Sequence, residues 1–302
     1  MNNKISLVIS KQEITNALEF YNITDEKYIK KCYECLQNTL QDSILITKFN
    51  DIHKLLFFDG LDRSEIKQLW QTNNLYELFG ENCHPFITNL ILLSGYKLHQ
   101  NNMDKFLLDE HQRSIHIKRV SESLTKDIYE KNLDGIRISQ MLWGAYFVNV
   151  KIIEVGRLQY ELCSYNPINE NISENCVKIH IPKGNKLDIQ DVLYSLKNSK
   201  QYIKEYFNLN NTNYYCVSWL LSEELHKIIN DNSNIYKFYN LFDITPGTDA
   251  TKDILNFVFG SRDITDYSTL PETTSLQTKL KQMLISNHQI NLGIGTLKQE
   301  YL

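Results

Sequence analysis

The feature that most constrains the fold is a change in the spacing of apolar residues near residue 135 of this 302-residue chain. Before that point apolar residues recur every three or four positions, as on one face of a helix. After it, the segment 152–165, IIEVGRLQYELCSY, alternates with a period of two, as a half-buried strand does. We therefore predict an all-α N-terminal domain over 1–134 and a mixed α/β domain over 135–302.

Helical signals recur through the first part of the chain. Ser10 is a candidate N-cap, and Glu13, three positions later, completes a capping box. The segment 84–100, HPFITNLILLSGYKLHQ, is apolar on nearly every side, which predicts a central helix. Cys32 and Cys35 form a C-x-x-C pair inside a helical pattern, without a second pair at zinc spacing, so we interpret them as core residues.

The second part reads as strands interleaved with helices. After the strand at 152–165 we expect an antiparallel strand, VKIHI, at 177–181 and a helix over 189–207 begun by Asp188. The remaining expected elements are strands at 213–221, 236–244 and 290–297, and helices at 222–229, 251–260 and 275–284, the last capped by Ser275. This order predicts one mixed sheet with covering helices.

Composition limits the classes of function. The net charge of −4 gives no basic field, so we expect no nucleic-acid partner and no anionic membrane partner. The most apolar run, 87–96, is far shorter than the ~20 residues that cross a bilayer. No secretory h-region follows Met1, and six scattered cysteines suggest reduced thiols, so we expect a cytoplasmic protein. The richness in Asn, Lys and Ile is typical of an AT-rich bacterial genome.

One loop attracts attention. In HIPKGNKLDIQDVL, 180–193, a strand runs through a Lys-Gly-Asn-Lys turn into a helix. Backbone amides and the dipole at a helix N-terminus attract anions, and glycine permits close approach, so this arrangement suits a phosphate group. The same arrangement also simply turns a corner.

Six short motifs, in order over roughly 140–295, carry a resemblance to the GNAT acyltransferases. They are G-R-L-Q-Y-E (156–161), H-I-P-K-G (180–184), S-W-L-L (218–221), S-N-I-Y-K-F (233–238), F-V-F-G (257–260) and T-S-L-Q (274–277). The chain resembles, in particular, bacterial acyltransferase-domain proteins with a helical N-terminal domain and a GNAT-like C-terminal domain.

The resemblance implies a place for acyl-CoA. In a GNAT fold acyl-CoA lies between the fourth and fifth strands, which correspond here to 177–181 and 214–221. The loop after the fourth strand would bind the pyrophosphate through Lys183, Gly184, Asn185 and Lys186. Ser218 would face the cleft, and Asn234 would bind the pantetheine arm or, alternatively, cap a helix. No metal is expected.

The resemblance also implies the chemistry. Acyl transfer to an amine needs a base, for which Glu161 and His180 are candidates, and an acid for the thiolate, for which Tyr236 is the candidate. Arg157 and Gln159 would bind the acceptor substrate. The competing interpretation is that these residues form the polar face of a covered sheet, with Tyr236 in the core.

The expected function is transfer of an acyl group, acetyl by expectation, from acyl-CoA to the amine of a small-molecule or peptide acceptor. The loop departs from the family pattern, since only one glycine is present and Asp188 would compete with an anion for the helix amides. The alternative is therefore a catalytically degenerate GNAT-like module that binds or regulates.

Overall fold

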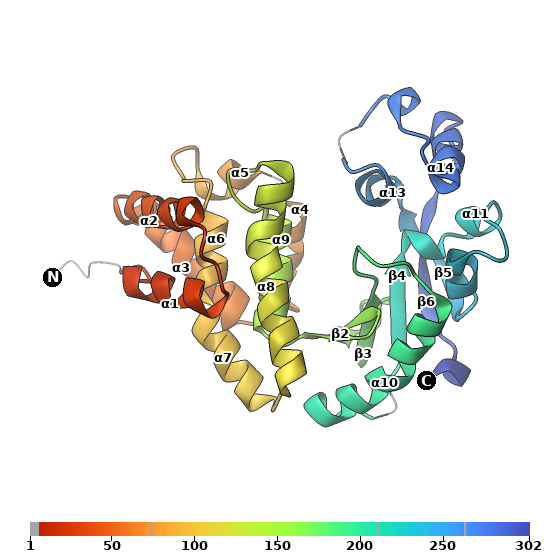
Figure 1. Cartoon of the computed structure of the whole chain (residues 1–302), viewed down its shortest axis with the longest axis horizontal. Coiled ribbons are helices and arrows are strands. Elements are labelled where there is room, and N and C mark those ends of the chain that lie inside the picture. The colour runs from red at the N-terminus through yellow and green to blue at the C-terminus, as the bar shows by residue number, and fades with distance from the viewer. Residues whose placement is uncertain (1–5, 73, 211, 263) are drawn as a thin grey trace. The chain divides into compact units, whose positions relative to one another are not determined.

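The computed structural model describes residues 6–72, 74–210, 212–262 and 264–302. The chain forms two compact units, Met1–Ile153 and Glu154–Leu302 (Figure 1). The first is helical, and the second is built on a mixed sheet. This is the helical region followed by a mixed α/β unit that the sequence predicts.

The helical unit is built around α6. Its described helices are α1 (Lys11–Phe20), α2 (Glu26–Leu40), α3 (Ser43–Phe57), α4 (Ser64–Gln71), α5 (Leu75–Phe79), α6 (Ile87–Ser94), α7 (Tyr96–Lys105), α8 (Glu110–Lys131) and α9 (Ile138–Val148). Every residue of α6 from Ile87 to Leu93 is buried, because α1, α2, α3 and α9 all pack against it. The predicted central helix is confirmed, although it breaks at Gly95 into α6 and α7.

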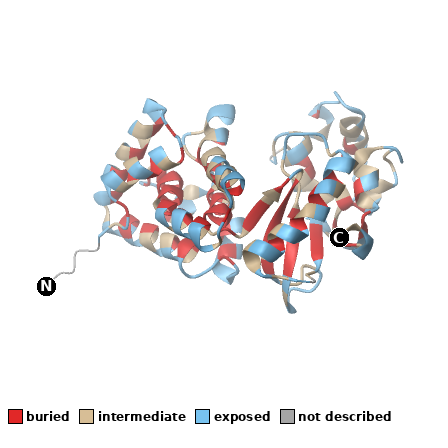
Figure 2. Cartoon of the chain, turned by 60° about the horizontal axis from the view of Figure 1, so that its bottom comes forward, coloured by how far each residue is buried: buried red, intermediate tan, exposed pale blue. Residues whose placement is uncertain are grey.

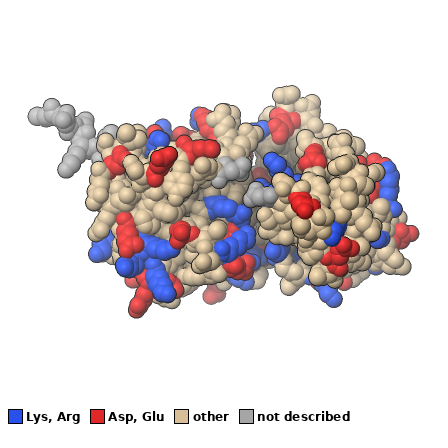
Figure 3. All heavy atoms as spheres, turned by 90° about the horizontal axis from the view of Figure 1, so that it is seen from above, with Lys and Arg blue, Asp and Glu red and all other residues tan. Residues whose placement is uncertain are grey.

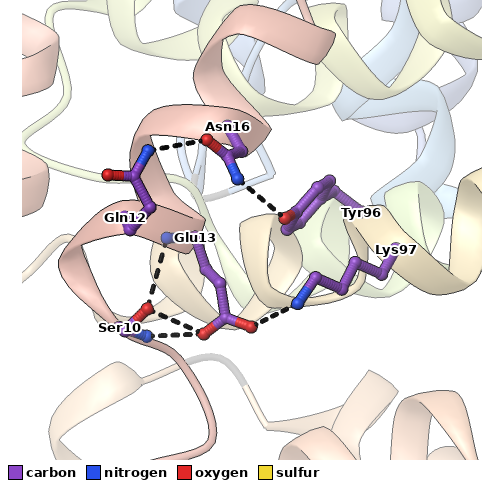
Figure 4. A network of polar contacts seen from close by, with 6 residues as sticks. All are labelled: Ser10, Gln12, Glu13, Asn16, Tyr96 and Lys97. Carbon is purple, nitrogen blue, oxygen red and sulfur yellow. Dashed lines mark hydrogen bonds and ion pairs between the residues drawn. The ribbon is translucent and has the colours of Figure 1, made fainter.

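The start of α1 is fixed by a polar network (Figure 4). The Ser10 hydroxyl accepts a hydrogen bond from the Glu13 amide at 3.3 Å, and the Ser10 amide donates to Glu13 Oε2 at 2.9 Å, which completes the predicted capping box. Lys97 Nζ lies 2.7 Å from Glu13 Oε1, and Asn16 Nδ2 donates to the Tyr96 hydroxyl. The cap therefore also ties α1 to α7.

The segment after Gly135 packs into the helical unit. A Cβ at Gly135 would lie 2.1 Å from the Pro85 carbonyl oxygen, so only glycine fits there. The Ile136 amide donates to Asn89 Oδ1 at 3.0 Å, and the Thr88 hydroxyl donates to the Ile136 carbonyl at 2.8 Å. With α9 in the same core, the two units divide after Ile153, whereas the sequence placed the boundary at 134/135.

The second unit contains a six-stranded sheet in the order β1-β2-β3-β4-β6-β5. The strands are β1 (Ile152–Val155), β2 (Leu158–Tyr165), β3 (Ser173–His180), β4 (Tyr214–Ser218), β5 (Phe242–Asp249) and β6 (Asn291–Leu297). Its helices are α10 (Ile189–Phe207), α11 (Glu223–His226), α12 (Asn234–Tyr239), α13 (Thr251–Val258) and α14 (Ser275–Ile285). The strands carry much of this unit's buried surface (Figure 2).

The pairing of β3 with β4 is short. The two strands are parallel, and the ladder joins only Val177 with Tyr214 and Lys178 with Tyr215. β3 continues to His180, while β4 continues to Ser218 along β6 as its antiparallel partner. Within these described strands the β3–β4 ladder therefore stops before the carboxyl ends, where the two strands part.

Helix α10 covers one face of the sheet. It spans Ile189–Phe207, as the sequence predicts, and buries Val192, Leu196 and Ile203. The Tyr160 hydroxyl on β2 lies 2.7 Å from Ser195 Oγ on α10, so this interface contains a hydrogen bond as well as apolar contacts. The apolar side chains of β2 and β3 face this helix, which leaves their polar side chains on the opposite face.

Four sequence predictions in this unit are wrong. The segment 152–165 is two strands, β1 and β2, separated by a turn at Gly156 and Arg157. The strand expected over 213–221 is β4, which ends at Ser218 before a 3₁₀ helix at Trp219–Leu221. The segment 236–244 is not one strand: α12 occupies Asn234–Tyr239, begun by the Ser233 side chain, and β5 begins at Phe242. The cap of α14 is Thr274, one residue before the predicted Ser275, because its hydroxyl accepts from the Gln277 amide at 3.1 Å.

Candidate functional site

The β2–β3 hairpin places four polar side chains on one face. The antiparallel register pairs Gln159 with His180 and Glu161 with Lys178. Directly opposed residues point to the same side, and alternate residues along a strand do so too. This face is opposite to the one that α10 covers.

Glu161 and His180 are joined directly. His180 Nε2 lies 2.6 Å from Glu161 Oε2, and the side chains are 30% and 7% exposed for His180 and Glu161 respectively. An ionised carboxylate only accepts hydrogen bonds, so Nε2 of His180 is the donor to Glu161. A histidine oriented by a buried carboxylate in this way is suited to general-base chemistry.

Lys178 is a charged neighbour that our sequence reasoning missed. Its Nζ donates to the Tyr165 hydroxyl at 2.9 Å and lies 5.1 Å from the centre of the Tyr165 ring. Burial alone would lower the pKa of Lys178, but the Glu161 carboxylate and Tyr165 raise it overall, so the amine is charged at neutral pH. The period-two pattern was a sufficient signal, because Lys178 lies two residues before His180.

Gln159 shares this face but is already engaged. Its Nε2 donates to Glu154 Oε2 on β1 at 2.6 Å, and Gln159 is buried. Contact with an acceptor substrate would require this hydrogen bond to rearrange.

Arg157 lies elsewhere than expected. It belongs to the β1–β2 turn, in which Gly156 has a φ of +58°, and its side chain reaches the loop after β3. The guanidinium donates to the carbonyls of Pro182 at 3.0 Å, Asn185 at 2.8 Å and Lys186 at 3.0 Å. Because Nε, Nη1 and Nη2 each donate to a loop carbonyl, Arg157 stabilises the loop.

The loop itself is exposed. Lys183, Gly184, Asn185 and Lys186 are all exposed, Gly184 has a φ of +139°, and a Cβ built there would meet no atom within 4 Å. The Asp188 side chain accepts from the Gln190 amide at 2.9 Å, so the expected competition for the helix amides is present. The loop thus exposes backbone groups and two lysines to a ligand, while the Gln190 amide at the start of α10 is already bonded to Asp188.

Three other predicted site residues lie outside the hairpin. Ser218 Oγ, at the end of β4, accepts from the Leu220 amide at 3.1 Å. Asn234 is the first residue of α12, whose cap is Ser233, so the capping alternative for Asn234 is wrong. Tyr236 stacks on His226, with ring centroids 4.3 Å apart, and its backbone amide donates to Ser233 Oγ at 3.1 Å.

The described residues contain neither a candidate metal-binding group nor a helix that could span a membrane, and Figure 3 shows the surface charge on one face. No three His, Cys, Asp or Glu side chains among them form a group that could hold a metal ion. None of the helices in those same ranges is long and apolar enough to cross a membrane. On the face seen in Figure 3, side chains of both signs are interspersed over the two units.

The second unit has a family assignment. Residues 152–297 match the family model described as the GNAT-like C-terminal domain. The match covers the segment whose motifs carry the resemblance. No curated protein matches the chain in sequence.

Solved structures with the same fold span nearly the whole chain. A crystal structure of an acyltransferase in complex with decanoyl-CoA and teicoplanin matches with a TM-score of 0.74 and 16% identity, covering 99% of this chain and 91% of that one. A mutant acyltransferase in complex with octanoyl-CoA gives the same four values. An acyltransferase in complex with decanoyl-CoA matches with a TM-score of 0.62 and 15% identity, covering 94% and 98% of the two chains.

Proposed function

We propose that this protein is an acyl-CoA-dependent N-acyltransferase whose base is His180, oriented by Glu161. The observation that carries the proposal is the His180–Glu161 hydrogen bond at the carboxyl end of β3, where β3 and β4 part. The GNAT-like family assignment and the acyl-CoA complexes of similar structures support it.

The proposed reaction uses four side chains of this chain, a base, an acid and two contacts of the cofactor. Nδ1 of His180 accepts a proton from the acceptor amine, whose nitrogen then attacks the thioester carbonyl. The tetrahedral intermediate collapses to an amide and releases the CoA thiolate. Tyr236 is the proposed proton donor to that thiolate, and Ser218 and Asn234 are the proposed contacts of the pantetheine arm.

The acyl group is proposed to be of medium length. Similar structures hold octanoyl-CoA or decanoyl-CoA, and these complexes favour a chain longer than acetyl. A series of acyl-CoA substrates from acetyl to decanoyl tests this directly: the account predicts the highest kcat/KM at eight to ten carbons, and an optimum at acetyl would contradict it.

The acceptor is proposed to be a polar amine. One similar structure holds teicoplanin beside decanoyl-CoA, which supports a small-molecule or peptide acceptor here. Gln159 is the proposed acceptor contact, through exchange of its hydrogen bond with Glu154.

A binding module without catalysis is the second candidate, favoured by one observation. Asp188 occupies the Gln190 amide at the start of α10, where an anion would otherwise be bound. Release of free CoA from acyl-CoA, followed with a thiol reagent and a panel of amines, separates the two. Amine-dependent thiol release that His180→Gln abolishes supports the enzyme. Acyl-CoA binding without such release would favour the module.

A further inference from the structure

Arg157 donates three hydrogen bonds to the loop after β3. Its guanidinium lies inside the loop and donates to the carbonyls of Pro182, Asn185 and Lys186, at 2.8 to 3.0 Å. These carbonyls come from both sides of Gly184, the one glycine of the loop. The loop is therefore folded around the guanidinium of Arg157, which belongs to the β1–β2 turn.

These carbonyl contacts determine the direction of three amides. The described chain has no cis peptide bond, and in a trans peptide the C=O and the following N–H point in opposite directions. Since the three carbonyls point at Arg157, the amides of Lys183, Lys186 and Leu187 point away from it. None of these amides donates to another described residue.

Outward amides backed by a cation form an anion-binding surface. Loop N–H groups that point away from the protein attract anions, and the nearby guanidinium adds a full positive charge. A loop with several glycines can adopt such a shape by itself, whereas this one has only Gly184.

We infer that Arg157 is the positioning residue of the CoA pyrophosphate site: it holds the loop so that the amides of Lys183, Lys186 and Leu187 face the two phosphates. This inference rests on the proposed function, because it takes the pyrophosphate of acyl-CoA as the anion. Arg157 acts through the loop backbone and does not touch the reacting atoms.

The test compares two acyl donors. Decanoyl-CoA carries the pyrophosphate, and decanoyl-pantetheine carries the same thioester without it. Arg157→Lys, which keeps the charge but not the fork, and Arg157→Ala should each raise the dissociation constant and the KM for decanoyl-CoA by roughly tenfold or more. Values for decanoyl-pantetheine, and kcat with either donor, should stay within about twofold.

Three controls keep the result interpretable. Arg262→Ala removes an arginine of the same unit that pairs with Asp253. It should leave the dissociation constant and the KM unchanged for both acyl donors. Millimolar guanidinium should partly restore decanoyl-CoA binding to Arg157→Ala. Thermal unfolding of each variant measures folding independently of binding.

Two failures are distinguishable. If the wild type binds no CoA species, the proposed function falls, and the inference falls with it. If the wild type binds decanoyl-CoA but the Arg157 variants bind it equally well, or lose both donors alike, only the role of Arg157 is overturned.

Discussion

Glu161 contacts His180 and lies opposite Lys178 on the face of the β2–β3 hairpin that α10 does not cover. Lys178 is opposite Glu161 in the register, and its raised pKa keeps it cationic. The attraction between the Lys178 ammonium and the Glu161 carboxylate is one cause of that raised pKa. Glu161 in turn orients the His180 ring through the hydrogen bond from Nε2.

Replacing either partner should therefore slow the chemical step. We expect His180→Gln to lower kcat by roughly 10²- to 10⁴-fold, the usual contribution of a general base. Glu161→Gln should lower kcat less, because Nε2 keeps a hydrogen-bond acceptor but the charge is lost. Steady-state thiol release measures both.

His288→Gln is the matched control, since His288 is an exposed histidine of the same unit. Equal kcat values for His180→Gln and the wild type would contradict the assignment of the base.

These residue contacts were only partly accessible from sequence. The period-two spacing puts Glu161 on the face of Gln159, and an antiparallel partner brings His180 there, so their proximity follows from pattern alone. The contacts of Arg157 do not. They depend on the positive φ of Gly156 and on a loop 25 to 29 positions further on, neither of which periodicity specifies.

At the scale of elements, the loop and α10 form the proposed pyrophosphate site. Lys186→Glu reverses a charge beside the outward amides, and Gly184→Trp adds a bulky residue where φ is +139°. Either change should abolish the rise in melting temperature caused by decanoyl-CoA.

Lys252→Glu makes the same charge change at an exposed site on α13, and it should leave that rise intact. An unchanged rise in the loop variants would place the cofactor elsewhere.

The cap of α1 gives an independent prediction about stability. Ser10→Ala removes the hydroxyl that accepts from the Glu13 amide, and should cost about 1 kcal/mol of the free energy of unfolding of the helical unit. Ser10→Asp, another good N-cap, should cost much less. Urea unfolding monitored by circular dichroism provides the measurement, and equal losses for both variants would contradict the capping role.

Element boundaries followed from sequence where capping and periodicity agreed. The limits of α10 were predictable because Asp188 precedes a long amphipathic run. The segment 236–244 was not, because its Tyr and Phe residues favour a strand, while the local Ser233 cap stabilises a short helix. Whether Ser233 can cap a helix depends on where the chain turns before it, and tertiary packing determines that turn.

At the scale of the molecule, the chain divides into a helical unit and a GNAT-like unit, and the first should be sensitive to acid. His99 is fully buried, and its Nδ1 lies 3.1 Å from the Tyr21 hydroxyl. Burial, together with the neighbouring His116, lowers the pKa of His99 well below its usual value. The native state therefore holds His99 neutral.

The stability of the helical unit should fall as the pH falls below about 6.5, the ordinary pKa of an unfolded histidine. In that range the unfolded chain binds a proton that native His99 does not, which costs at most ~1.4 kcal/mol per pH unit. Above that pH both states are neutral and the effect disappears. Urea unfolding between pH 7.5 and 5.5 measures the slope.

His99→Phe removes this titration and should flatten the slope, and His288→Gln should not. His53, whose pKa is lowered by burial to about 4, contributes in the same direction and remains in both variants. An identical slope in His99→Phe and the wild type would contradict the assignment.

The central claim is that acyl-CoA binds where β3 and β4 part. Hydrogen exchange of the whole chain with and without saturating decanoyl-CoA tests it most directly. The account predicts slower exchange in residues 177–190 and 214–218, with no comparable change in α13 or α14. Unchanged exchange in both of these segments at saturation would contradict the claim.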